Sequence, residues 1–192
     1  MIRTPATFLR VGLLLLLALV LELSAVGHVA LFGGHIDLVP LVVAAIAYYA
    51  GSAAGSASGF AMGFLVDLAA GQTMGASSLV LSAIGYGVGR YRELRDPSHG
   101  LLPIPVGAAA TAAWVTAFAA VSFMLDIGAT VSPLVIREMI VTVLLNALVA
   151  LPVFWACGRV LRPSLVVDPA EMRRRRRSPR ETGPLGLRGL EV

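Results

Sequence analysis

The chain has 192 residues, of which 57% are hydrophobic and only 14% are charged, and its mean hydropathy is +0.84. Soluble domains are about 45–50% apolar and about 25% charged, so the composition excludes an ordinary soluble domain. All the basic residues are arginines, and most lie outside the apolar runs, which argues against a nucleic-acid-binding protein. The apolar runs do not alternate as the strands of a β-barrel do. We therefore predict an all-α polytopic membrane protein.

The apolar runs predict about six transmembrane helices in a domain covering residues 1–162. The expected helices cover about 8–26, 37–51, 56–71, 76–89, 103–125 and 133–158. Between Leu38 and Ala70 only Asp67 is charged, and this run is too long for one span of about 20 residues and short for two. We expect the break at Gly51–Ser58, where all side chains are small.

The first apolar run has a competing interpretation as a cleaved signal peptide. Arg3 and Arg10 would form its basic region, and residues 25–27 a cleavage site with small residues. The run is long, however, and Glu22 stands just before that site. An uncleaved helix is therefore preferred.

The arginines predict the orientation of the helices. With six spans, every arginine except Arg137 lies on the side of the two termini and of loop 90–100. Because arginine-rich loops stay in the cytoplasm, both termini are expected to be cytoplasmic.

Residues 163–192 form an arginine-rich cytoplasmic tail that is expected to be disordered, because it has too little apolar surface to fold alone. Its basic run comprises Arg173, Arg174, Arg175, Arg176 and Arg177. Two roles stay open for this run: attraction to anionic lipid, or a charge block that enforces topology.

A stripe of glycines is the most conspicuous pattern in the chain. From position 51 to position 75 every fourth residue is glycine, except that Asp67 takes one step. The predicted packing or partner interface comprises Gly55, Gly59, Gly63, Asp67, Gly71 and Gly75. Small residues let membrane helices approach closely. Packing within the chain is favoured over a partner interface, although both remain open.

Three polar residues within the apolar runs are candidate sites, since such residues are costly in a membrane. Asp67 either caps a turn, accepting from the backbone at residues 72–73, or fixes a helix contact. Glu22 is expected to hydrogen-bond for packing rather than relay protons, with Asn146 or Arg137 as its partner. Asn146 and the serines of span 76–89 are expected to link helices by hydrogen bonds.

Catalytic, metal and cofactor sites are not expected. Ser58 lies in a near miss to the Gly-x-Ser-Gly motif of intramembrane proteases, because Ser56 replaces the first glycine. All three histidines lie in predicted loops, so no base is available at membrane depth. His28, His35 and Asp37 match no strong metal template. We therefore predict a protein that is not an enzyme.

The segment Gly59–Gly75 carries a family resemblance. It resembles the G-F-x-x-G-x-x-x-D-L-x-x-G-x-x-x-G segment of the rod shape-determining protein MreD family, and the following Gly85-Tyr86 and basic loop are similar too. Asn146 in the last span agrees with that family, whereas Ile36 replaces a proline that is frequent there. The arginine-rich tail lies outside the pattern.

The resemblance implies a non-enzymatic component of the bacterial cell-wall elongation machinery. Its implied partners are an MreC-like protein, the actin-like MreB, the RodA glycosyltransferase and a penicillin-binding transpeptidase. It also implies a fold similar to the substrate-binding subunits of energy-coupling-factor vitamin transporters. Such a transporter subunit is the alternative function, although the first span lacks the Ala-x-x-x-Ala pair through which those subunits typically couple to their motor.

Overall fold

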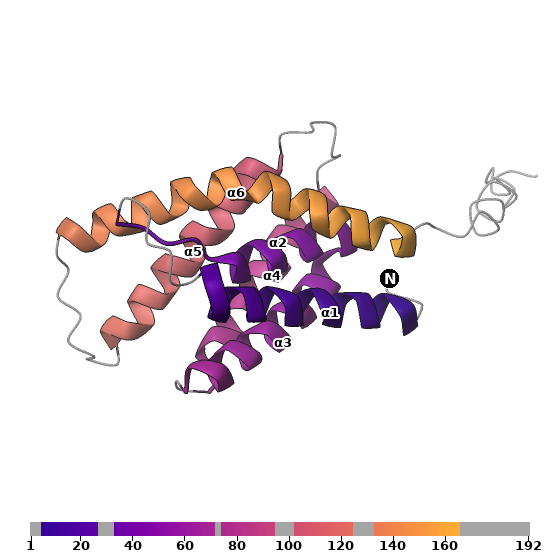
Figure 1. Ribbon diagram of the computed structural model, residues 1–192, viewed down its shortest axis with the longest axis horizontal. Helices are drawn as coiled ribbons and strands as arrows, with labels where there is room; N and C mark the ends of the chain where they lie inside the picture. Colours follow the sequence, from indigo (N-terminus) through magenta and orange to yellow (C-terminus); the bar gives the residue numbers. More distant parts are fainter. Residues whose placement is uncertain (1–4, 27–32, 72–73, 95–101, 125–132, 166–192) are drawn as a thin grey trace, which may run out of the picture.

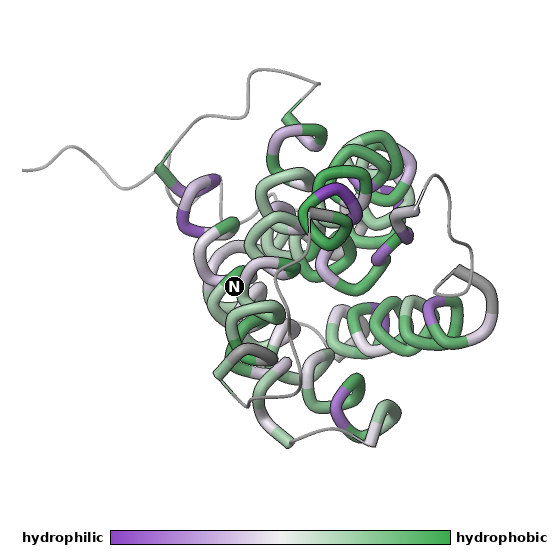
Figure 2. Tube along the Cα trace, turned by 90° about the vertical axis from the view of Figure 1, so that its left-hand side faces the viewer, coloured by the Kyte–Doolittle hydropathy of each residue, from purple (hydrophilic) through white to green (hydrophobic). Residues whose placement is uncertain are grey.

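The computed structural model describes residues 5–26, 33–71, 74–94, 102–124 and 133–165. These residues form α1 (Pro5–Leu21), η1 (Glu22–Val26), α2 (Leu38–Ala50), α3 (Ser52–Ala70), α4 (Ala76–Leu94), α5 (Pro103–Met124) and α6 (Pro133–Leu165). Four of the described helices, α1, α3, α5 and α6, are long and apolar enough to cross a membrane. Apolar residues dominate the helices, and polar ones are confined to a few turns (Figure 2). The predicted all-α polytopic membrane fold is confirmed.

The short helix α2 is the centre of the bundle. Residues Val39–Ala47 are all buried, and α2 contacts each of the other five α-helices. It lies between α6 and α1, with α4 behind it (Figure 1). A helix that is hydrophobic all round is stable only when it is surrounded in this way.

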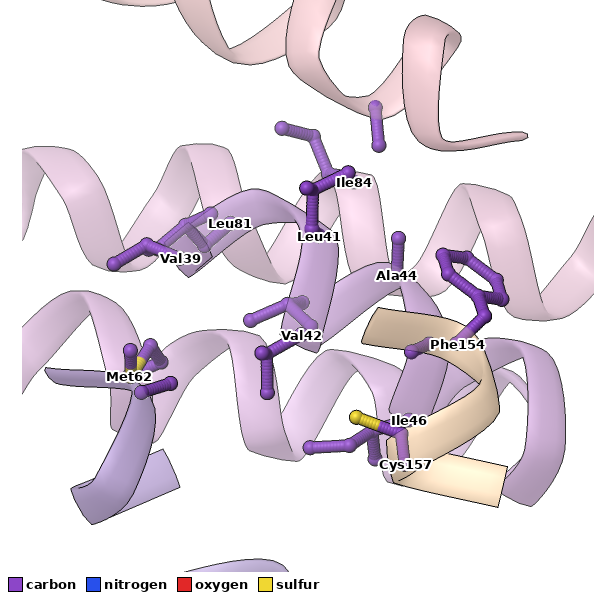
Figure 3. Packing of buried hydrophobic residues seen from close by; sticks show 14 of the residues in the cluster. Val39, Leu41, Val42, Ala44, Ile46, Met62, Leu81, Ile84, Phe154 and Cys157 are labelled. Atoms are coloured by element: carbon purple, nitrogen blue, oxygen red, sulfur yellow. The ribbon is translucent and has the colours of Figure 1, made fainter. Parts of the chain in front are cut away.

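Side chains from four helices close the core around α2. Leu41 and Ile46 of α2, Met62 of α3, Leu81 of α4 and Phe154 of α6 are fully buried. Figure 3 shows the side chains of these residues converging around the central helix. The protein interior is thus formed by α2 and the helix faces that cover it.

The break between α2 and α3 is shorter than the sequence predicted. The expected loop at Gly51–Ser58 is wrong, because Gly51 alone separates the two helices and Gly55 already lies within α3. Gly51 has φ +92°, a conformation that L side chains rarely adopt. The chain folds back there, so that Gly55 lies against Ala47. Small residues that would make a poor helix in water form one here because α4 packs against them.

The glycine stripe of α3 packs directly on the backbone of α4. A Cβ on Gly55 would overlap the Gly85 carbonyl, one on Gly59 the Leu81 carbonyl, and one on Gly63 the backbone of Ser78. The stripe is therefore occupied within the chain, which leaves no room on it for a partner helix.

The last two glycines of the predicted interface have a different role. Gly71 and Gly75 have positive φ values and nothing within 4 Å of a built Cβ, so they shape the turn between α3 and α4 and do not pack. Gly71 is the left-handed C-cap of α3, and its N–H bonds the Asp67 carbonyl. Among the described residues Gly71 and Gly75 therefore pack against no other helix, and their contact with a partner stays a prediction.

The tight pairing of α3 and α4 predicts a sharp contrast between two glycine substitutions. Gly59→Leu forces apart backbones that touch, and we expect a loss of more than the ~1–3 kcal/mol typical of overpacked side chains. Gly12→Leu in α1, where a built Cβ meets nothing within 4 Å, should leave stability nearly unchanged. Thermal unfolding in detergent measures both, and equal melting temperatures would contradict the observed packing.

Candidate functional site

Polar residues gather at the N-terminal end of the central helix. We call Glu22, His35, Asp37, Thr142 and Asn146 the outer polar junction. Glu22 comes from the π-helical turn η1, His35 and Asp37 from the segment before α2, and Thr142 and Asn146 from α6. Three parts of the chain therefore meet at this point.

The depth of the junction follows from α6. Arg137 and Arg159 are exposed and lie 22 positions apart, roughly 33 Å along a helix axis. This matches a hydrocarbon core of about 30 Å, and we infer that the two arginines lie at its two borders. Asn146 lies nine positions inward of Arg137, roughly 13 Å below that border. We call the Arg137 border the outer end.

The central helix consequently begins inside the membrane. Its 13 residues extend roughly 20 Å, too short to span, and its N-cap residue Asp37 is bonded to Asn146. The chain reaches this depth as the non-helical segment 33–37. Non-helical backbone at such depth is tolerated only when protein or water satisfies its polar groups.

Side chains of the junction supply the missing hydrogen bonds. The Leu38 N–H donates to Glu22 Oε2 at 2.8 Å, and the Asp37 N–H donates to Asn146 Oδ1 at 3.1 Å. The His35 N–H donates to Thr142 Oγ1 at 3.2 Å. Helices leave their first N–H groups without intrahelical partners, so Glu22 and Asn146 cap α2, while Thr142 satisfies the segment before it.

The partner predicted for Glu22 is therefore wrong. Among the described residues Glu22 accepts from the backbone N–H of Leu38, because a buried helix start needs a hydrogen-bond acceptor. Thr142 was missed by the sequence interpretation. The sequence did contain a signal for Thr142. A helix of 13 residues is too short to span the membrane, so the helix packed at its end must carry polar groups.

His35 connects the junction to the outer border. Its ring lies with Nε2 3.4 Å from Asp37 Oδ1 and Nδ1 3.6 Å from Glu138 Oε1. Both carboxylates are therefore within ion-pairing distance of the ring. No group of three or more metal-ligating side chains forms among the described residues, and His28 lies outside them.

The other end of α2 is satisfied in a similar way. Arg92 of α4 donates from Nη1 to the Tyr49 carbonyl at 3.0 Å, and its guanidinium lies 6.0 Å from the centroid of the Tyr48 ring. Gly158 of α6 packs on the Tyr49 ring. Both ends of the buried helix are thus capped by side chains of its neighbours.

Carboxylates close the α3–α4 pair at its two ends. Buried Asp67 accepts from the Gly75 N–H at 2.7 Å and the Ser77 N–H at 3.3 Å, which holds the start of α4. Glu93 of α4 accepts from the Ser52 N–H at 2.9 Å, which holds the start of α3. Asp67 therefore caps a turn, at residues 75 and 77; the predicted donors at 72–73 lie outside the described residues.

The serines of α4 divide into two groups. Ser82 bonds Ser56 of α3 through their hydroxyls at 2.8 Å, an interhelical bond of the predicted kind. The hydroxyls of Ser77 and Ser78 have no hydrogen-bond partner among the described residues. For these two the predicted role is wrong: Ser77 contributes its backbone N–H to the Asp67 cap, and Ser78 is a small residue against Gly63.

The fold and the junction define a polytopic membrane protein whose described buried polar groups serve mainly to hold helices together. The family model of the rod shape-determining protein MreD matches residues 2–161. The chain belongs to the MreD family, a family of shape-determining membrane proteins, as the resemblance predicted. No curated protein and no solved structure matches the chain. The similarity to energy-coupling-factor subunits stays a prediction.

Substitution of Glu22 can distinguish a role as a hydrogen-bond acceptor from a role as a proton carrier. Glu22→Gln keeps an oxygen that accepts from the Leu38 N–H, so we expect nearly unchanged stability. Glu22→Leu leaves a buried donor unsatisfied and should cost about 1–3 kcal/mol. Unfolding in detergent and a functional assay in cells check both variants. Wild-type stability with lost function in Glu22→Gln would indicate proton transfer instead of capping.

Proposed function

We propose that the protein is a non-enzymatic component of the cell-wall elongation machinery of the bacterial inner membrane. In this role it is a scaffold that binds an MreC-like protein and, through it or directly, MreB, RodA and a penicillin-binding transpeptidase. Membership of the MreD family supports the rod-shape role. The finer statement, a scaffold without catalysis, is supported by how the polar groups are used.

One observation carries the proposal: the polar side chains at the helix ends bind the backbone of this same chain. Glu22 and Asn146 bind the start of α2, Arg92 binds its end, and Asp67 binds the start of α4. A catalytic group must reach a substrate with its reactive atoms. These groups are instead engaged in stabilising an irregular bundle, which is the property that a scaffold requires.

Partner helices are expected on exposed helix faces. The glycine stripe of α3 is covered by α4, whereas a face of α3 about 100° around the helix exposes Phe60, Phe64 and Leu68. Substitution of a stripe glycine should therefore abolish partner binding only indirectly, through loss of the α3–α4 pair.

The vitamin-transporter function receives no comparable support. The two hollows described between α4 and α5 are lined almost wholly by apolar side chains, with Tyr91 as the polar exception. A vitamin site needs several placed polar groups to fix the ligand. Retention of a vitamin by the purified protein would nevertheless favour the transporter over the scaffold.

Affinity purification from the native membrane tests the scaffold. The tagged wild-type chain and Gly12→Leu should both retain an MreC-like protein. Gly63→Leu should lose at least about 80% of it together with its own thermal stability, since its backbone contact with Ser78 is broken. Depletion of the protein should convert rod-shaped cells to round ones.

Two results would contradict the proposal. Cells that keep rod shape and normal growth after depletion would exclude the elongation role. An MreC-like protein that is absent from wild-type purifications in mild detergent and in native nanodiscs would exclude the scaffold, while leaving family membership untouched.

A further inference from the structure

An apolar groove runs between α4 and α5. A hollow of about 590 Å³ is lined by Leu79, Ala83 and Gly87 on α4 and by Ala109, Ala113 and Ala117 on α5. A second hollow of about 360 Å³ shares Gly87 and Ala109 and continues to Tyr91. The two hollows share lining residues and form one groove from Leu79 to Tyr91.

Gly87 is small for no reason within the described chain. Its neighbours Gly85 and Gly89 are pressed against the backbone of α3, whereas a Cβ on Gly87 would meet nothing within 4 Å. A glycine inside a helix costs roughly 1 kcal/mol relative to alanine. At this position glycine lowers the stability of the helix without allowing a close contact among the described residues. This indicates that a molecule outside the chain occupies the space beside Gly87.

The length of the groove matches a lipid acyl chain. The two hollows together extend from Leu79 to Tyr91, which is 12 residues or roughly 18 Å, close to half of a hydrocarbon core of about 30 Å. The groove therefore fits an extended hydrocarbon chain within one leaflet.

The charge at the end of the groove indicates the headgroup. Arg90 lies one turn beyond Gly87, at the same border as Arg92, and its side chain is 56% exposed. Its ion pair with Glu93, 3.3 Å between Nη1 and Oε2, is an exposed pair of the weak kind. The guanidinium can therefore turn to a phosphate, and the arginine pattern places this border in the cytoplasm.

We propose that the α4–α5 groove binds one anionic phospholipid of the inner leaflet, with an acyl chain along Gly87 and Ala109 and the phosphate at Arg90. This site is separate from the basic run Arg173–Arg177, for which attraction to anionic lipid stays a prediction. It is also independent of whether the protein acts as a scaffold.

Native mass spectrometry of the full-length protein, released from nanodiscs of phosphatidylglycerol or phosphatidylcholine, tests the site. We expect wild-type protein to retain one phosphatidylglycerol, and Gly87→Leu, which fills the groove floor, to lose most of it. Gly12→Leu is the matched control, because Gly12 is also an exposed helix glycine with nothing within 4 Å of a built Cβ. Ala109→Leu fills the groove from α5 and covers the case in which Gly87→Leu fails to fold.

A charge series separates the headgroup contact from the tail. Arg90→Gln should lower phosphatidylglycerol retention about fivefold, the effect expected of one arginine near an anionic surface, while phosphatidylcholine retention is unchanged. Arg137→Gln, at the outer border, should retain lipid as wild type does. Replacing Arg173–Arg177 by glutamine should leave the single tightly held lipid in place.

Several outcomes would overturn the proposal. Equal lipid retention by Gly87→Leu, Ala109→Leu and Gly12→Leu would exclude the groove. Retention that depends on Arg173–Arg177 alone would assign the lipid to the tail. A groove-filling variant that keeps its lipid but loses a bound protein would show that a partner helix, and not a lipid, occupies the groove.

Discussion

The structure depends on satisfying the backbone of a helix that is too short to cross the membrane. Residues Val39–Ala47 of α2 are buried, and neighbouring side chains supply hydrogen bonds that are missing at the two partly buried ends of the helix. Glu22, Asn146 and Arg92 supply them from three different helices. Each of these helices must present its polar group at the depth of the matching end of α2. This requirement restricts how the helices pack around α2.

The pairing of α3 with α4 allows the helices around α2 to approach one another closely. Enclosing a central helix with five others requires close approach somewhere in the ring, and the glycines of α3 allow two backbones to touch. Asp67 and Glu93 then hold the helix starts at opposite ends of this pair. Contact along the middle and capping at both ends restrict sliding of the two helices, so the pair forms a rigid wall for α2.

The sequence contained most of the architecture but not its internal partners. The helices were predictable because each is dominated by apolar residues, and the family was predictable from Gly59–Gly75. The break at Gly51 was overestimated because small residues indicate a loop in water and a packed helix in a membrane. Period-four glycines predict a close contact without saying which helix makes it. The partner of Glu22 was missed because it is a backbone N–H, which has no signature in the sequence.

The use of the interior polar groups also implies that function depends on the outer surface of the protein. A membrane protein gains little stability by placing apolar side chains inside rather than toward lipid. Its distinctive interior groups are therefore polar. Here the polar groups at the helix ends bind the backbone of the chain itself. Selectivity for partners or lipids must then come from the shape and border charge of exposed faces. Gly87 meets that description, since it hollows an exposed face within one turn of Arg90 and contributes nothing to packing inside the bundle.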